Sequence, residues 1–136
     1  MKELSFLLVD DDRDDSELFK EALNEVDHSA IFFHAESGED ALLKLNESDL
    51  PEIIFLDINM PRMNGWEFLR VLKYNEQFRK IPVIIYSTTS HPEEKDTAIA
   101  WGATFKTKPN SYSDLKKMLT EVVYNLKISL TETVPL

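Results

Sequence analysis

Three acidic residues of this sequence stand directly after short apolar runs. Asp10 and Asp11 follow the first run, and Asp57 follows another. A hydroxyl residue, Ser87, follows a further run, and Lys108 comes soon after the last one. Carboxylate oxygens suit Mg²⁺ or Mn²⁺, and an ammonium group beside them supplies further positive charge. Together these residue types predict a divalent-cation site, provided that the fold brings them to one place.

Neighbouring carboxylates need such a partner because they repel one another. At a separation of about 4 Å the repulsion is roughly 1 kcal/mol in water and about 4 kcal/mol at a protein surface. Acidic residues are also common at helix N-termini, where they accept hydrogen bonds from the first backbone N–H groups. We expect that second, structural role for Asp12, Asp14 and Asp15, which precede or open a helical segment.

The elements that must position these residues are visible as alternating sequence patterns. Apolar runs without polar alternation are typical of parallel strands that are covered on both faces. These runs are residues 6–9, 30–33, 53–56 and 83–86, with a weaker fifth strand at 104–106. Segments of helical period, several of which open with capping residues, lie between and after them. We expect helices over 14–26, 37–45, 64–74, 92–100 and 112–128.

Five such strand–helix units predict an α/β fold with a doubly wound, five-stranded parallel sheet and helices on both faces. In this fold the functional site lies at the carboxyl ends of the strands. The acidic residues, Ser87 and Lys108 all fall at or just beyond those ends. The connectivity therefore predicts that they meet at one edge of the sheet.

Length and charge exclude several other classes of protein. The chain has 136 residues and no cysteine, which favours one cytoplasmic domain over residues 1–128 without disulfides. We expect residues 129–136 to form a disordered tail. The net charge of −10 disfavours nucleic acid and anionic lipid as partners. No apolar run approaches the length of a membrane helix, and no signal peptide is recognisable.

The stretch from Asp57 to Gly65 reads D-x-x-M-P-x-x-x-G. It strongly resembles the receiver domain of two-component response regulators, in the form of stand-alone, CheY-like receivers. The resemblance extends over residues 5–126, through Leu8-Val9-Asp10-Asp11, Ser87-Thr88, Gly102-Ala103 and Lys108-Pro109. It implies a flavodoxin-like strand order of 2-1-3-4-5.

The resemblance also implies a role for each residue of the site. Asp57 would be the phosphoacceptor. Asp11, Asp57 and the backbone carbonyl of Asn59 would bind Mg²⁺ or Mn²⁺, and Asp10 would act through water. Ser87 would hydrogen-bond the phosphoryl group, and Lys108 would pair with it.

Further implied roles concern the phosphorylated state and its decay. Asn59 and Thr89 would flank the path of the water that hydrolyses the acyl phosphate, and so tune its lifetime. Ser87 and Phe105 would form the conformational switch, with Phe105 moving inward. The Lys108–Pro109 peptide bond is expected to be cis.

The function implied is signal transduction. The donor would be the phosphohistidine of a sensor histidine kinase or of a phosphotransfer protein. The chain would assist its own phosphorylation and dephosphorylation without being an enzyme with a separate substrate. The output would be docking to a downstream protein, homodimerisation or phosphate relay. The expected docking surface comprises the fourth helix, fifth strand and fifth helix, and we would probe it at Lys95, Trp101, Phe105 and Tyr112.

Three alternatives stay open at this point. A flavin- or nucleotide-binding protein of the same architecture would need a phosphate loop, which is disfavoured by only three glycines. A phosphatase-type hydrolase could use Asp10 and Asp12, which have the required spacing, but leaves the stretch from Asp57 unexplained. A receiver-like module that acts by binding alone is the third.

Overall fold

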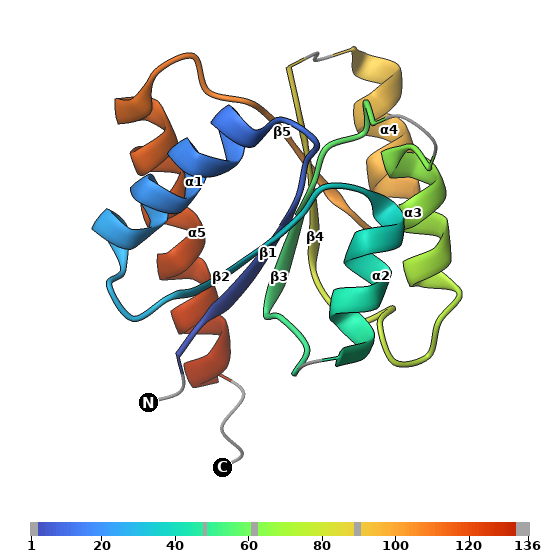
Figure 1. Cartoon of the computed structure of the whole chain (residues 1–136), viewed down its shortest axis with the longest axis horizontal. Coiled ribbons are helices and arrows are strands. Elements are labelled where there is room, and N and C mark those ends of the chain that lie inside the picture. Colours follow the sequence, from blue (N-terminus) through green and yellow to red (C-terminus); the bar gives the residue numbers. More distant parts are fainter. Residues whose placement is uncertain (1–2, 48, 61–62, 89–90, 133–136) are drawn as a thin grey trace.

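The computed structural model describes residues 3–47, 49–60, 63–88 and 91–132. Strands and helices alternate along the chain in five units (Figure 1). The strands are β1 (Ser5–Val9), β2 (Ile31–Ala35), β3 (Ile53–Leu56), β4 (Val83–Ser87) and β5 (Thr104–Thr107). The helices are α1 (Arg13–Val26), α2 (Gly38–Glu47), α3 (Gly65–Lys73), α4 (Pro92–Ala100) and α5 (Tyr112–Glu132).

The strands form one parallel sheet in the order β2-β1-β3-β4-β5, which confirms the predicted fold and strand order. Strand β1 lies between β2 and β3, with Val9 opposite Leu56 in the register. Strand β3 lies next to β4, with Leu56 opposite Ile85. All strands therefore end at the same edge of the sheet, and the residues that follow β1 and β3 are neighbours.

Helices cover both faces of the sheet: α1 and α5 lie on one side, and α2, α3 and α4 on the other (Figure 1). Alternate residues of a strand point to opposite faces. Phe6 and Leu8 accordingly belong to the core under α1 and α5, and Leu7 and Val9 to the core under the other three helices. Two apolar cores of this kind fix the level of each strand end relative to the others.

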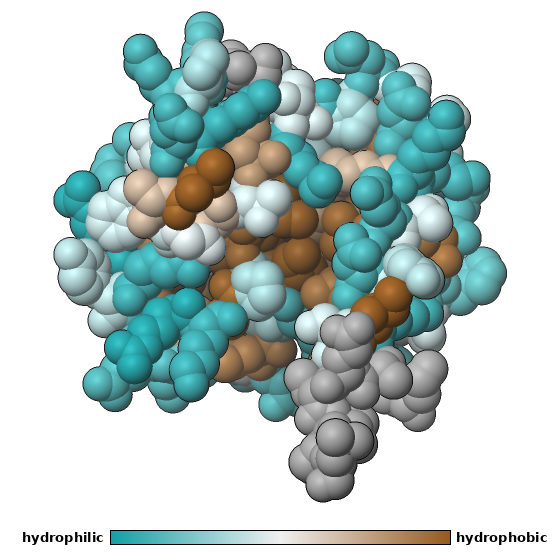
Figure 2. All heavy atoms as spheres, turned by 180° about the vertical axis from the view of Figure 1, so that it is seen from behind, coloured by the Kyte–Doolittle hydropathy of each residue, from teal (hydrophilic) through white to brown (hydrophobic). Residues whose placement is uncertain are grey.

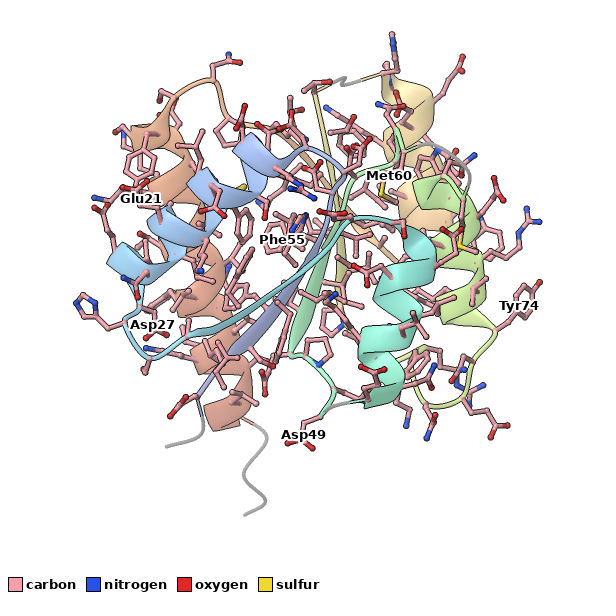
Figure 3. All side chains as sticks on the ribbon, viewed as in Figure 1. Glu21, Asp27, Asp49, Phe55, Met60 and Tyr74 are labelled. Carbon is pink, nitrogen blue, oxygen red and sulfur yellow. The ribbon has the colours of Figure 1, made fainter. Side chains whose placement is uncertain are left out.

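An aromatic cluster packs the sheet against α1. Phe55 points from the sheet toward this helix (Figure 3), and the centroid of its ring lies 4.9 Å from that of Phe19 in an edge-on arrangement. The Tyr86 ring contacts both of them edge-on, at centroid distances of 5.7 Å from Phe55 and 5.9 Å from Phe19. Edge-to-face pairs of this kind add to the stability from buried area. The cluster anchors α1 over β3 and β4, close to the strand ends.

Some details differ from the expectation. Leu18 is an apolar residue of α1 but is 47% exposed, because the core is filled from this helix by Phe19, Ala22 and Leu23. Helix α5 continues to Glu132 rather than ending at Ile128. Residues 133–136 of the expected tail lie outside the described residues. No helix among the described residues is long and apolar enough to span a membrane.

Candidate functional site

Asp57 is positioned by the pairing of β3 with β1. Its backbone N–H donates to the carbonyl oxygen of Val9 at 2.9 Å, which extends the ladder by one residue beyond β3. Its side chain is nearly buried, and the backbone N–H of Asn59 donates to its Oδ1 atom at 3.0 Å. The carboxylate is thereby held on one side by the backbone while its other oxygen faces the rest of the site.

Asp10 occupies the equivalent position at the end of β1 and is fully buried. Its backbone N–H donates to the carbonyl oxygen of Ala35 at 3.0 Å, and its Oδ1 atom accepts the N–H of Asp12 at 2.9 Å. Its carbonyl oxygen accepts a hydrogen bond from Nε2 of His34 at 2.7 Å. Every polar group of Asp10 named here has a fixed partner, which makes this carboxylate a rigid part of the site.

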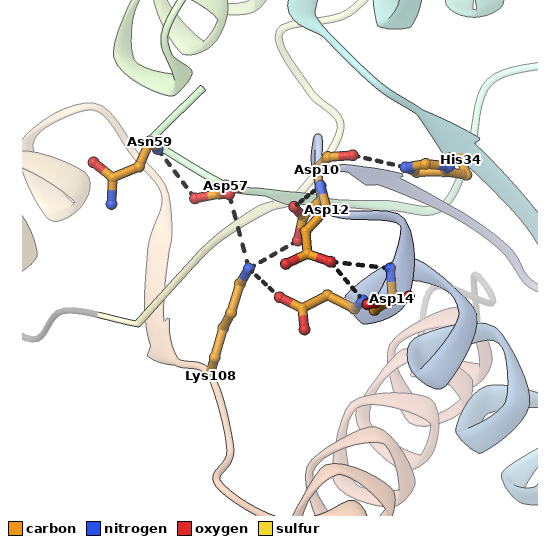
Figure 4. Close-up of polar contacts among 8 residues, drawn as sticks. Asp10, Asp12, Asp14, His34, Asp57, Asn59 and Lys108 are labelled. Atoms are coloured by element: carbon orange, nitrogen blue, oxygen red, sulfur yellow. Dashed lines mark hydrogen bonds and ion pairs between the residues drawn. The ribbon is translucent and has the colours of Figure 1, made fainter. Parts of the chain in front are cut away.

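Lys108 reaches the two carboxylates from the loop after β5. Its backbone N–H donates to the carbonyl oxygen of Ser87 at 2.7 Å, which ties the loop to the end of β4. Its Nζ atom lies 2.8 Å from Oδ2 of Asp10, 2.9 Å from Oδ2 of Asp15 and 3.8 Å from Oδ2 of Asp57 (Figure 4). One ammonium group therefore bridges residues that follow β1 and β3.

Burial and ion pairing oppose each other in this cluster. Burial raises the pKa of the Asp10 carboxyl, and the hydrogen bonds from Lys108 and from the Asp12 N–H offset this only in part. Burial by itself would lower the pKa of Lys108, but its hydrogen bonds to Asp10 and Asp15 outweigh burial and raise it. Lys108 is therefore a permanent cation at neutral pH.

The acidic cluster fits a hard divalent cation. One carboxylate oxygen each from Asp10, Asp11 and Asp57 lies within 4.8 Å of the others. Asp15 adds a fourth negative charge through Lys108, whose single positive charge cannot balance them. Because Mg²⁺ and Mn²⁺ take oxygen ligands and often keep several waters, an exposed residue such as Asp11 can serve as a direct ligand.

The other predicted site residues lie at three different levels of burial. Ser87 is buried at the end of β4, one residue beyond the level of Asp57 on the neighbouring strand. Phe105 is half-buried on β5 and packs against the core under α2, α3 and α4. Asn59 is exposed in the loop after β3. Thr89, predicted to tune the lifetime, lies outside the described residues.

One expectation is wrong: the Lys108–Pro109 peptide bond is not cis, since the described chain contains no cis peptide bond. A peptide bond before proline favours trans by only about 0.5–1 kcal/mol, so the surroundings decide the isomer. The trans bond is compatible with the ion pairs that Lys108 makes in this structure.

Of the acids after β1, one has the helix-terminal role that we predicted, and another has an additional contact that we did not predict. Asp12 caps α1, since its Oδ1 atom accepts the N–H groups of Asp14 and Asp15 at 3.0 and 3.1 Å. Asp15, which we assigned to the helix terminus alone, also contacts Lys108. Helical spacing could have revealed this, since a residue three positions after the cap turns back toward the strand end.

His34 is a second residue whose position the sequence did not reveal. It is half-buried on β2 with its ring beside the Asp10 carbonyl. Neither its neighbours in the sequence nor any metal-ligand spacing indicates this contact. It arises from the register, in which Leu8 pairs with His34 and so brings the ring to the level of the strand end.

The face seen from behind Figure 1, where the β5 edge lies, has hydrophobic side chains at its centre and hydrophilic ones around them (Figure 2). Phe105, Trp101 and Tyr112 are half-buried, and Lys95 is exposed. The four positions that we would probe therefore remain accessible to a partner.

Comparisons with known proteins agree with this geometry. The model of the response regulator receiver domain family matches residues 6–120. The response regulator Rcp1 of Synechocystis is 34% identical over 122 residues, covering 83% of this chain and 82% of the relative. The chemotaxis protein CheY1 of Helicobacter pylori is 28% identical over 121 residues, covering 88% of this chain and 97% of the relative. The crystal structure of Mn²⁺-bound Rcp1 superposes with a TM-score of 0.79 and 28% identity over 98% of each chain.

Proposed function

The chain belongs to the response regulator receiver domain family of two-component systems, and we propose that it accepts a phosphoryl group on Asp57 from a phosphohistidine. The observation that carries this proposal is the meeting of Asp57, Asp10 and Lys108 at one edge of the sheet. A carboxylate is a poor nucleophile toward an anionic phosphate, so this reaction needs positive charge beside it.

The proposed reaction is an in-line displacement at phosphorus. An oxygen of the Asp57 carboxylate forms the new P–O bond, the P–N bond to the donor histidine breaks, and the imidazole leaves. The N–H of Asn59 fixes Oδ1 of Asp57, which leaves Oδ2, on the side of Lys108, as the attacking atom. Positioning and electrostatics carry most of the catalysis in transfers of this kind.

A divalent cation would be held by Asp11, Asp57 and the carbonyl oxygen of Asn59, with Asp10 acting through water. When bound, Mg²⁺ would neutralise charge on the phosphoryl oxygens. Support for this comes from the convergence of the three carboxylates and from the Mn²⁺-bound form of the related Rcp1. Lys108 would pair with a phosphoryl oxygen from the other side.

The phosphorylated state would be read through Ser87 and Phe105. The buried hydroxyl of Ser87 would move toward the phosphoryl group, and Phe105 would follow it inward from the edge strand. This movement changes the surface made by α4, β5 and α5. We propose that the surface then binds a downstream protein or a second copy of the chain.

The product is an acyl phosphate, which water can hydrolyse. The chain would thus act on itself and needs no separate substrate. The partners would be a sensor histidine kinase or a phosphotransfer protein, met in the cytoplasm. The acidic net charge of −10 gives no support for binding nucleic acid or an anionic membrane.

The test is phosphorylation by a small donor. The protein is incubated with acetyl phosphate and Mg²⁺, and its intact mass is measured. We expect a gain of one phosphoryl group in the wild type and none in Asp57→Asn or without the cation. Labelling that persists in Asp57→Asn would refute the assignment, and turnover of generic phosphate esters would favour a hydrolase instead.

A further inference from the structure

Asp15 has a place in the site that helix capping does not explain. We propose that Asp15 is a positioning residue that holds the Lys108 ammonium away from Asp57 until a phosphoryl group arrives, and thereby slows phosphorylation. The inference rests on the proposed function of Asp57. It is carried by the different distances and exposures of the three carboxylates around Lys108.

The distances define which contacts are hydrogen bonds. Nζ of Lys108 lies 2.8 Å from Asp10 and 2.9 Å from Asp15, both within hydrogen-bonding range. Oδ2 of Asp57 lies 3.8 Å away, which is an ion-pair distance but too long for a hydrogen bond. Before phosphorylation, Lys108 is therefore bound to the two acids from β1 and α1 rather than to the proposed acceptor.

The two hydrogen-bonded acids differ in how easily they can release Lys108. The Asp10 side chain is 0% exposed, so leaving its charge without a partner would be costly. The Asp15 side chain is 38% exposed, so water can replace Lys108 there at little cost. Asp15 is therefore the partner that Lys108 can exchange, and Asp10 the partner that it keeps.

Phosphorylation supplies new acceptor oxygens that Lys108 can bind in place of Asp15. A phosphoryl group on Asp57 adds nearly two negative charges and three acceptor oxygens within reach of Nζ. Lys108 keeps its three protons throughout and changes only the oxygen to which one of them is donated. Because the hydrogen bond to Asp15 helps to keep the ammonium group 3.8 Å from Asp57, and because the Asp15 carboxylate repels the incoming phosphate, Asp15 opposes the transfer.

Asp14 provides a matched control for Asp15. Both acids lie in the first turn of α1, and both donate their backbone N–H to the capping Asp12. Replacement of either by asparagine keeps that backbone bond and removes one negative charge. The ion pair with Lys108 is made by Asp15, whereas Asp14 is exposed at the helix surface.

The test compares the rates at which acetyl phosphate and Mg²⁺ label the variants. The step forms the P–O bond to Asp57 and breaks the bond to the acetate oxygen, and acetate leaves. We expect labelling of Asp15→Asn to be about threefold to fivefold faster than that of the wild type, the upper part of the range for a partly exposed ion pair. Asp14→Asn should stay within about twofold of the wild type, and Asp15→Glu should return toward it.

A second measurement reports on Lys108 without metal or donor. The Nζ NMR resonance of Lys108, assigned with Lys108→Arg, should shift in Asp15→Asn and stay in place in Asp14→Asn. Thermal unfolding of each variant confirms that it folds. If the wild type is labelled but Asp15→Asn is labelled no faster than Asp14→Asn, the positioning role is overturned while the proposed function stands. An unlabelled wild type would overturn both.

Discussion

Gly65 lies so close to the backbone of Asp57 that it has no room for a side chain. A Cβ atom at this position would be 2.6 Å from the carbonyl oxygen of Asp57 and would overlap with the Cα atom of Ile58. Both neighbours are backbone atoms of the segment that carries the proposed phosphoacceptor. The first residue of α3 thus sets how far this helix can approach the end of β3.

Gly65→Ala should therefore displace Asp57. We expect a loss of about 1–3 kcal/mol in the free energy of unfolding, the usual cost of overpacking, and slower labelling by acetyl phosphate. Denaturant unfolding and intact mass measure the two effects. Gly38, the first residue of α2, is a matched control, because a Cβ there would meet the flexible end of Met63, its Sδ atom, at 2.6 Å. Equal losses in Gly65→Ala and Gly38→Ala would contradict the explanation.

The proposed metal site predicts that two adjacent acids differ in their effect on Mg²⁺ binding. Asp11 belongs to the carboxylate cluster, whereas Asp12 caps α1. Asp11→Asn should weaken Mg²⁺ binding by about tenfold or more, since a charged ligand is lost. Asp12→Asn removes the same charge and keeps the cap, because asparagine caps helices as well as aspartate, so its affinity should change much less. Calorimetric titration with Mg²⁺ measures the affinity of each variant. An equal loss of affinity in both variants would mean that Asp11 is not a metal ligand.

The junction of α1 and α5 predicts a pH dependence of stability. Glu25 contacts Nζ of Lys116 at 3.1 Å and accepts the hydroxyl of Tyr112 at 2.9 Å. These two partners, Lys116 first, lower the pKa of Glu25 below its ordinary value. A lowered carboxyl pKa stabilises the fold above the unfolded pKa, about 4.3, and this contribution is lost as the pH falls through the folded pKa.

Glu25→Gln should therefore unfold at a slightly lower temperature than the wild type at pH 7, and the difference should close below about pH 4. Thermal melts across this range measure it. Glu17→Gln, an exposed change on the same helix, serves as the control and should show a smaller difference. A Glu25→Gln difference that persists unchanged at pH 3 would rule out the ion pair as its cause.

The apolar runs in the sequence predicted the sheet and its strand ends, because buried parallel strands consist of consecutive apolar residues. The residues placed at those ends, Asp10, Asp57 and Ser87, are where the connectivity requires them to be. The cap at Asp12 was also predictable, since its hydrogen bonds are local to one turn. In each case the signal lies within a few residues of the structure that it indicates.

The sequence could not show contacts that depend on side-chain reach between elements. Asp15 meets Lys108 across 93 residues of chain, and His34 meets Asp10 across 24. Leu18 has the spacing of a core residue but lies on the edge of the helix stripe, where exposure depends on the neighbouring elements. The isomer of the Lys108–Pro109 bond likewise depends on tertiary surroundings, which is why the family resemblance misled us there.

The loop after β3 predicts that a substitution at Asn59 changes how long Asp57 keeps its phosphoryl group without changing whether it accepts one. Its backbone N–H holds Asp57, whereas its side chain is exposed and directed away from that carboxylate (Figure 4). A substitution keeps the backbone bond and changes only the side chain at the mouth of the site. In Asn59→Arg the longer side chain can cover the phosphoryl group and hinder the approach of water.

We therefore expect Asn59→Arg to be labelled to the same extent as the wild type but to lose its phosphoryl group more slowly, by roughly threefold to tenfold. The decay is followed by intact mass after the donor is removed. Asn125→Arg, which makes the same charge change at an exposed position on α5, should decay at the wild-type rate. An unchanged decay in Asn59→Arg would mean that water reaches the acyl phosphate by a path that this side chain does not border.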